Sequence, residues 1–517
     1  MESRIDPAFL QKIKDKIAKI QADSLTMNQE SLAECIFPHK WFNPFPKFRF
    51  SERPDTAAAS ILEGSIVILV DNSPACMILP SSVFDIIEEA DDYYFPPVTG
   101  TYLRLSRMMT GVLCLLLTLL LVFPLGTSAY ADYATDNNYF RISCTVNGNT
   151  QSSRGFCWYT KEDCDSAVLI MKNGVDISAS LQFDDSCEKW EGYYMHKVTV
   201  SGLSADTTYT YKVGDGKTWS DVGTFTTDDG DSNVNILVYA DVQASSLNNF
   251  LVGARAVNAG LNSSAAPFDF MINLGDFTND STNEEWNYYA EAFDSICLNN
   301  TLAPVAGNHD GLGCPNWFNN MFNLDTSESV QTKDGVNYSF DYGNTHIAVL
   351  NTNDIFSVSQ AQLKWLENDM NKTNKDWKIV SMHKTPYTLG KDGKWPDAMY
   401  LQQALTAVCD KTGVDLIISG HDHQYLRTKS LTGNEVKEGG ATYVLCGTAG
   451  SKRYQVRPFA INNFTPMEFI NTMVSQRDGK YFNGKDFDSQ NDLYIGSCYN
   501  TITVNGGELT FNSYVIT

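Results

Sequence analysis

The sequence predicts an α/β fold of sheets covered by helices, with an all-β domain in front of it. Three observations predict this fold. From residue 233 onward, continuous apolar runs of strand length recur, and such runs are typical of sheets covered on both faces. Runs with helical periodicity, such as 359–370, lie between them. Residues 132–228 instead contain short alternating runs separated by Gly, Asp and Asn turns.

The length and the local pattern predict several domains, because 517 residues are too many for one ordinary domain. Apolar residues make up 43% and charged residues 19%, which is a globular composition. We expect an N-terminal segment at 1–107, an apolar segment at 108–131, the all-β domain at 132–228 and the α/β domain at 229–517.

The net charge of −23 argues against nucleic acid as a partner, since such a chain lacks the basic surface that a phosphate backbone requires. If the substrate is itself anionic, positive charge has to come from elsewhere. A bound metal ion is the natural source.

The apolar run Gly111–Leu125 follows two arginines and is followed by small residues ending in Ala129-Tyr130-Ala131. This pattern is typical of a secretory signal peptide. Two interpretations are open: a signal peptide at 108–131, or a signal anchor that attaches the chain to a membrane through residues 109–131. Both predict that everything after residue 131 is extracellular or on the cell surface.

The twelve cysteines include no CxxC pair, which argues against zinc ribbons and thioredoxin-like redox motifs. Four of them, Cys144, Cys157, Cys164 and Cys187, lie close together in the sequence. In an exported domain they form disulfides, and otherwise they are free thiols; both alternatives are open.

Polar clusters follow five of the apolar runs predicted to be strands, which are residues 234–240, 268–274, 302–306, 377–382 and 416–419. Because ligands gather at the carboxyl ends of strands in such folds, we expect these clusters to meet at one edge. Carboxylate and amide oxygens mixed with imidazoles suit zinc, manganese or iron, and six candidates are enough for two ions. The candidate ligands are Asp241, Asp276, Asn308, His383, His421 and His423.

The blocks Asp241-x-Gln, Gly-Asp276, Gly-Asn-His-Asp310, Val-x-x-His383 and Gly-His-x-His423, the last followed by Tyr425 and Arg427, resemble the signature of calcineurin-like metallophosphoesterases, purple acid phosphatases in particular. The resemblance implies a β-sandwich flanked by helices. It also implies hydrolysis of a phosphoester substrate, most simply a phosphomonoester, by a hydroxide that bridges two divalent or trivalent ions of iron, zinc or manganese.

The same resemblance implies a role for each residue. Asp276 bridges the two ions, and His309 stabilises or protonates the leaving oxygen while Asp310 fixes its tautomer. The remaining ligands divide between a first ion, held by Asp241 and His423, and a second ion, held by Asn308, His383 and His421.

Two positions depart from the family pattern. Asn279 stands where purple acid phosphatases have the tyrosine that colours their iron, so we expect a colourless enzyme. Gln243 stands where the wider class has a histidine, and its amide either ligates the first ion or holds a water.

The segments outside the α/β domain resemble two other families. Residues 202–213 and 219–227 resemble the fibronectin-III-like domain that precedes the catalytic domain of plant-type purple acid phosphatases, with Tyr209 at a tyrosine-corner position. Residues 43–46, 51–55, 61–71, 91–94 and 100–105 resemble the A-subunit family of spore germination receptors.

Several functions compete. The leading one is a phosphomonoesterase, and the nearest variant is a phosphodiesterase or nucleotidase with the same ligands. A catalytically weakened surface binding protein is favoured only by the two departures, and a membrane-tethered germination component only by residues 1–107.

Overall fold

The computed structural model describes residues 138–264, 267–312, 315–354, 358–390, 396–457, 465–488 and 494–516, and five short strands between residues 57 and 106. The chain divides into two compact units, Met1–Tyr130 and Ala131–Thr517. In the first unit, antiparallel ladders join β1 (Ala57–Leu62), β2 (Ser65–Val70) and β3 (Cys76–Pro80), and join β4 (Asp92–Tyr93) to β5 (Leu105–Ser106).

The apolar segment 111–125 lies outside the described residues. Among the residues that are described, no helix is both long enough and apolar enough to span a bilayer. The membrane anchor therefore stays a prediction.

The second unit begins with a β-rich domain of two facing sheets around a core that includes Phe156, Trp158 and Tyr211. The Tyr209 hydroxyl accepts a hydrogen bond from the Ser204 backbone N–H at 2.9 Å, the bond that a tyrosine corner makes. One sheet contains β6 (Phe140–Thr145), β7 (Ser153–Thr160), β10 (Gln182–Trp190) and β11 (Tyr193–Ser201); the other contains β8 (Ala167–Lys172), β9 (Val175–Asp176), β12 (Thr208–Gly214) and β13 (Gly223–Thr226), with the 3-10 helix η2 (Ser178–Ser180) after β9.

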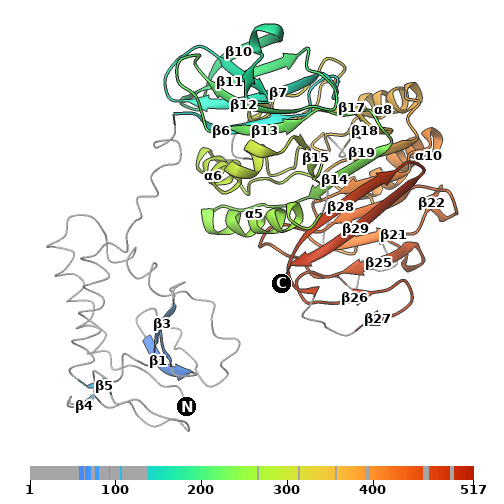
Figure 1. The fold of residues 1–517 in the computed structure, drawn as a ribbon. Coiled ribbons are helices and arrows are strands. Elements are labelled where there is room, and N and C mark those ends of the chain that lie inside the picture. Colours follow the sequence, from blue (N-terminus) through green and yellow to red (C-terminus); the bar gives the residue numbers. More distant parts are fainter. Residues whose placement is uncertain are drawn as a thin grey trace. The chain divides into compact units, whose positions relative to one another are not determined.

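The rest of the unit is built on two nine-stranded sheets that face each other (Figure 1). The first continues from the β-rich domain through β16 (Leu302–Pro304), β15 (Phe270–Asn273), β14 (Asn233–Tyr239), β28 (Ser497–Asn505) and β29 (Glu508–Ile516). The second runs in the order β17 (Tyr338–Tyr342), β18 (Thr345–Val349), β19 (Trp377–Ser381), β20 (Leu416–Ser419), β24 (Thr442–Cys446), β21 (Tyr425–Thr428), β25 (Ile470–Val474), β26 (Tyr481–Phe482) and β27 (Phe487–Asp488), and a separate ladder joins β22 (Leu431–Thr432) to β23 (Glu435–Val436).

Helices cover the outer faces of both sheets, so the predicted fold class, a β-sandwich flanked by helices, is confirmed. Alternate residues of β14 explain the layering: Ile236 and Val238 enter the core between the sheets, and Leu237 and Tyr239 pack toward the outer helices. The first sheet carries α5 (Leu247–Leu261), α6 (Asn283–Asn299) and α7 (Trp317–Met321), and the second carries α8 (Gln360–Lys372), α9 (Pro396–Tyr400), the π-helix η4 (Leu401–Leu405), α10 (Thr406–Thr412) and the 3-10 helix η6 (Met467–Phe469).

The predicted domains 132–228 and 229–517 share one sheet. Strand β6 pairs in parallel with β16, with Thr145 opposite Leu302, and this pairing joins the two parts of the sheet. Both parts belong to the single compact unit Ala131–Thr517. The β-rich domain is therefore continuous with the sheet that supports the candidate site, while its assignment as fibronectin type III stays a resemblance.

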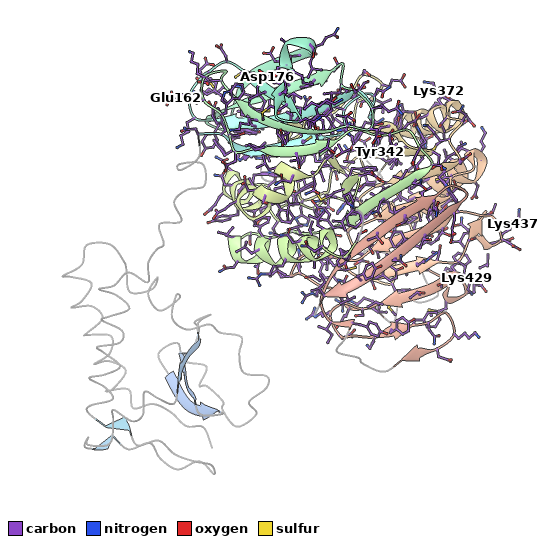
Figure 2. The ribbon with its side chains drawn as sticks, viewed as in Figure 1. Glu162, Asp176, Tyr342, Lys372, Lys429 and Lys437 are labelled. Atoms are coloured by element: carbon purple, nitrogen blue, oxygen red, sulfur yellow. The ribbon has the colours of Figure 1, made fainter. Side chains whose placement is uncertain are left out.

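Charged side chains lie on the surface and large apolar side chains lie in the interior, as expected for a globular composition. The labelled side chains Glu162, Asp176, Lys372 and Lys437 are exposed, and Tyr342 is buried (Figure 2). The four clustered cysteines are free thiols: Cys144 and Cys157 are buried, Cys164 is partly exposed and Cys187 is exposed.

A buried histidine fastens α8 to the second sheet. His346 Nδ1 lies 2.7 Å from Asp341 Oδ1 on the paired strand, and its Nε2 lies 2.9 Å from Asp369 Oδ2 on α8. Burial opposes protonation, but these two carboxylates prevail and raise the pKa of His346 to about 9.

The raised pKa predicts pH-dependent stability. The pKa of His346 in the folded protein exceeds the unfolded value of about 6.5. Protonated His346 therefore contributes on the order of 3 kcal/mol to the free energy of unfolding below pH 6.5, and this contribution is lost as the pH rises through about 9. Urea unfolding of the wild type and His346→Gln at pH 6 and pH 10 measures it. We expect the free energy of unfolding of the wild type to exceed that of His346→Gln by much more at pH 6 than at pH 10. A difference that does not change with pH would contradict this role of His346.

Candidate metal centre

Three oxygen-bearing side chains follow neighbouring strands of the first sheet. Asp241 follows β14, Asp276 follows β15 and Asn308 follows β16. These strands are mutually parallel, so their carboxyl ends lie at one edge. The backbone N–H of Gln243 donates to the Asp276 carbonyl at 2.8 Å and fastens the first two loops together.

The second sheet supplies the imidazoles. His383 follows β19, and His421 and His423 follow β20, which pairs in parallel with β19. The two sheets therefore bring different ligand types to the same edge, oxygens from one and nitrogens from the other. All six predicted ligand positions meet where the sheets face each other.

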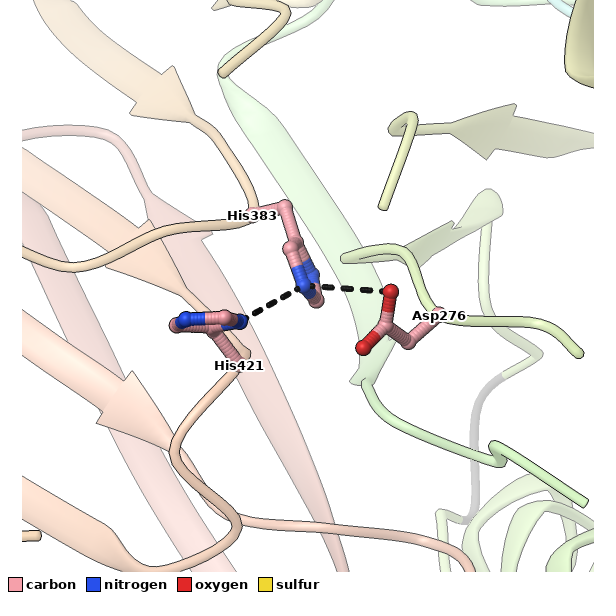
Figure 3. Close-up of side chains that lie close together, drawn as sticks. All are labelled: Asp276, His383 and His421. Atoms are coloured by element: carbon pink, nitrogen blue, oxygen red, sulfur yellow. Dashed lines mark hydrogen bonds and ion pairs between the residues drawn. The ribbon is translucent and has the colours of Figure 1, made fainter. Parts of the chain in front are cut away.

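Two candidate metal-binding groups of side chains result, and both contain Asp276. One group is Asp276, His383 and His421, and the other is Asp241, Asp276 and His423; within each group the ligand atoms lie within 4.8 Å of one another. His383 Nε2 lies 3.2 Å from both Asp276 Oδ1 and His421 Nδ1 (Figure 3).

Further distances complete the two groups. Asn308 Oδ1 lies 3.0 Å from His383 Nε2, which adds an amide oxygen to the first group. His423 Nε2 lies 3.4 Å from Asp241 Oδ1 in the second. Asn308 and His421 are half-buried and the other four ligand positions are buried, so the cluster opens to solvent on the side of these two residues.

Backbone carbonyls orient two of the rings. The Nδ1–H of His383 donates to the Leu274 carbonyl at 2.8 Å, and the Nδ1–H of His423 donates to the Lys452 carbonyl. Each Nε2 is then left as the ligand atom, the usual arrangement for a metal-binding histidine. Tyr454 stacks on the His423 ring at 4.3 Å. No sequence motif points to Leu274, Lys452 or Tyr454.

Backbone strain concentrates at this edge. Asp241, Gln243, Asp276 and His421 all have left-handed conformations, with φ of 54°, 34°, 52° and 81°. Such conformations are unfavourable for residues other than glycine and typically persist at functional sites. Gly307 shows how closely the loops pack, because a Cβ there would lie 2.0 Å from the Asp276 backbone nitrogen.

Gln243 contributes an unusual polar atom. The residue is only 4% exposed, and its Oε1 has no hydrogen-bond partner among the described residues. Burying an unpaired amide oxygen costs about 1–3 kcal/mol, so it needs a partner such as a cation. Together with the mixed oxygen and nitrogen donors around Asp276, this orphaned oxygen fits a site for metal ions.

The expectation that Asp310 fixes the tautomer of His309 is wrong. The buried Asp310 carboxylate accepts hydrogen bonds from the backbone N–H groups of Asp276, Phe277, Thr278 and Gly307, at 2.8–3.3 Å. The Nδ1–H of His309 donates instead to the Asn279 carbonyl. Asp310 therefore shapes the loop that carries Asp276, and a backbone carbonyl orients His309.

Three other residues of the motif blocks lie away from the ligands. The Asn279 side chain donates to Asp280 at 2.9 Å, while its carbonyl holds His309. Tyr425 is buried in the core between the sheets, and Arg427 reaches the Phe511 carbonyl at 3.5 Å.

The electrostatics of the cluster favour a cation. Burial raises the pKa of Asp241 and lowers those of His421 and His423. Burial also disfavours the charged form of His383, but the neighbouring Asp276 carboxylate raises the pKa of His383 to about 9. The proton on His383 neutralises the charge of Asp276. A metal ion that binds these two residues has to displace this proton.

Comparisons with known proteins agree with this geometry. Residues 234–425 match the calcineurin-like phosphoesterase family, and residues 139–227 match the N-terminal domain of purple acid phosphatases. Residues 1–124 match the Bacillus/Clostridium GerA spore germination proteins.

Individual proteins are also similar to this chain over part of its length. Purple acid phosphatase 22 from Arabidopsis thaliana is 22% identical over 303 residues, which cover 55% of this chain and 67% of the relative. Stage V sporulation protein AF from Bacillus subtilis (strain 168) is 39% identical over 113 residues, and the match covers 22% of each chain. The solved structure of PhoD covers 74% of this chain and 93% of its own, with a TM-score of 0.44 and 10% identity.

The match to the sporulation protein thus spans less than a quarter of that relative's length. The matches to the phosphoesterase and purple acid phosphatase families lie in the part of the chain that forms the two sheets. In order along the sequence, the matched segments are similar to GerA spore germination proteins, to the N-terminal domain of purple acid phosphatases and to calcineurin-like phosphoesterases.

Proposed function

We propose that this protein is an exported, metal-dependent phosphoesterase that hydrolyses phosphomonoesters at a two-metal site. The observation that carries the proposal is the pair of ligand groups that share Asp276. A shared carboxylate between two sets of donors is the arrangement that two adjacent cations require.

Asp276 would hold both ions. Asp241 and His423, with Gln243, would hold the first, and Asn308, His383 and His421 would hold the second. Bound together, two such ions neutralise phosphate oxygens and make a water molecule a strong nucleophile at neutral pH. Iron, zinc and manganese all suit this mixture of carboxylate, amide and imidazole donors.

We assign the assistance of the leaving group to His309. Its backbone N–H donates to Asp276 Oδ1 at 2.9 Å, so the residue adjoins the shared ligand, and it is half-buried on the open side. With Nδ1–H donating to the Asn279 carbonyl, the ring in its protonated form has Nε2–H left to donate to the leaving oxygen.

A chromogenic phosphomonoester, supplied to the full chain with and without a chelator, tests the proposal. We expect turnover that the chelator abolishes and that added zinc, manganese or iron restores. A matched phosphodiester measures the alternative activity. A folded, metal-loaded protein that hydrolyses neither ester would refute the proposal and favour a binding role, for which the departures at Gln243 and Asn279 are the argument.

The buried, unpaired Oε1 of Gln243 leads to a prediction about the first ion. Gln243→Ala should weaken that ion's binding about tenfold or more and lower the metal content after dialysis from about two ions per chain toward one. Elemental analysis measures this. Gln243→His should keep both ions, and the exposed Gln360→Ala serves as the control. Full metal content in Gln243→Ala would show that the amide is no ligand.

Export is part of the proposal and rests on the basic, apolar and small-residue pattern before residue 132. Fractionation of cells that express the full chain tests it. We expect the phosphoesterase part outside the cytoplasm, released if the segment 108–131 is cleaved and membrane-bound if it is an anchor. Recovery only from the cytoplasm would contradict export while leaving the enzymatic proposal intact.

A further inference from the structure

Residues 447–454, here called the bridging segment, lie against two of the proposed ligands of the first ion, Asp241 and His423. The segment follows β24, which belongs to the second sheet and pairs in parallel with β20, so it starts at the edge where the ligands meet. From there it crosses to the first sheet, because the Ala449 N–H donates to the Ala240 carbonyl at the end of β14, at 2.9 Å. The segment therefore links the two sheets beside the candidate metal centre.

The first half of the bridging segment holds the loop of Asp241. The Thr448 hydroxyl donates to the Asp241 carbonyl at 2.7 Å, and a Cβ at Gly450 would collide with the Val242 carbonyl, so the two backbones are in contact. Thr448 is itself fixed by the buried Gln476 side chain, which accepts from its N–H at 2.8 Å and donates to its carbonyl at 3.0 Å. These contacts support Asp241 in its left-handed conformation, with a φ of 54°.

The second half of the bridging segment holds His423 at three points. The Nδ1–H of His423 donates to the Lys452 carbonyl, and the Tyr454 N–H donates to the His423 carbonyl at 3.1 Å. The Tyr454 ring stacks on the imidazole at 4.3 Å, with the two planes 13° apart. Because its backbone, one ring nitrogen and one ring face are all held, the imidazole cannot rotate without losing a contact. Its Nε2 is thereby directed toward Asp241 Oδ1, 3.4 Å away.

The first ion depends on such support more than the second does. Gln243 and Asn279 stand where the family pattern has a histidine and a tyrosine, and the Asn279 side chain donates to Asp280. Asp241 and His423 therefore carry a larger share of the binding of this ion. A ligand that is already held in its binding orientation loses less conformational freedom when the ion binds, so a fixed orientation raises the affinity.

We infer that the bridging segment sets the affinity of the first ion, and that Tyr454 is the positioning residue through which it acts on His423. The inference rests on the proposed two-metal site and goes beyond it, because it makes the affinities of the two ions separable. The contacts of the segment described above reach Asp241 and His423. A change at Tyr454 therefore acts on the first ion and spares the second, which is proposed to be held by Asn308, His383 and His421.

Elemental analysis of the full chain after dialysis against graded chelator concentrations tests the inference without a substrate. Tyr454→Ala should lose one ion at a chelator concentration about tenfold lower than the wild type does, and should keep the other ion as the wild type does. Tyr454→Phe retains the stacked ring and should behave like the wild type. Tyr514→Ala is the matched control, because it removes an exposed ring that stacks on Tyr499 at 4.9 Å on the edge strand β29.

Two further variants identify the ion that Tyr454 serves. His421→Ala removes a proposed ligand of the second ion, and His423→Ala removes one of the first. In the His421→Ala background, adding Tyr454→Ala should weaken the binding of the remaining ion about tenfold. In the His423→Ala background, the same change should leave the affinity of the remaining ion unaltered, because the imidazole that Tyr454 positions is gone.

Three results would overturn the inference: wild-type affinity for both ions in Tyr454→Ala, loss of both ions together, or a loss in Tyr454→Phe equal to that in Tyr454→Ala. The last result would mean that the hydroxyl, and not the stacked ring, supports the ion. If circular dichroism shows that Tyr454→Ala does not fold, Tyr454→Leu, which keeps more of the side-chain volume, is measured instead with the same expected loss. A metal-loaded wild type that hydrolyses no phosphoester would refute the proposed function and leave these metal affinities unchanged.

Discussion

Asp276→Ala is expected to lose both metal ions and to reduce phosphoester turnover to background. Asp276 is the one residue common to both ligand groups, and its Oδ1 lies 3.2 Å from His383 Nε2. Without its carboxylate, the remaining donors would have to hold two cations at close range with one negative charge fewer between them. Elemental analysis of the purified variant and an assay with excess metal measure the two effects.

The exposed Asp280, four residues further along the same loop, provides the control. Asp280→Ala removes a carboxylate from the loop without touching either ligand group, so metal content and turnover should stay at wild-type values. If Asp276→Ala kept two ions per chain, the shared ligand would be another residue and the two-metal assignment would fail.

His309→Ala is expected to lower turnover by about 10²- to 10⁴-fold while both ions remain bound. His309 belongs to neither ligand group, but its backbone N–H contacts Asp276 and its ring is oriented by the Asn279 carbonyl. The loss should be smaller for substrates with good leaving groups, because these need less help from a proton donor. Comparing a nitrophenyl with an alkyl phosphate measures this difference.

His346→Gln is the matched control for His309→Ala. It removes a histidine that hydrogen-bonds Asp341 and Asp369 and lies away from the metal centre. At pH 7 and 25 °C its turnover should equal that of the wild type. An equal loss on both substrates in His309→Ala, or a loss of metal, would mean that His309 positions the site and does not donate a proton.

The sequence by itself determined the strands and the order of the candidate ligands. The predicted runs 234–240, 268–274, 302–306, 377–382 and 416–419 coincide with β14, β15, β16, β19 and β20 to within two residues at either end. Such runs can be recognised in a sequence because strands buried on both faces are apolar along their whole length. The polar residues that follow each apolar run are therefore easy to identify, and the ligand positions could be predicted from the sequence.

The roles of Asp310 and Asn279 could not be read in the same way. Both depend on loop conformations, and residue type does not say which backbone group a side chain will meet. Asp310 meets four backbone N–H groups, and His309 meets the Asn279 carbonyl. A family pattern carries residue identities from one protein to another, but it does not carry these contacts.

Only the tertiary structure decided how the ligands are divided. Oxygen donors come from the first sheet and imidazoles from the second, so the site exists only where the two sheets pack face to face. The pairing of β6 with β16, with Thr145 opposite Leu302, is likewise long-range. The physical reason is that hydrophobic burial sets which elements pack together, whereas local sequence sets only what each element presents.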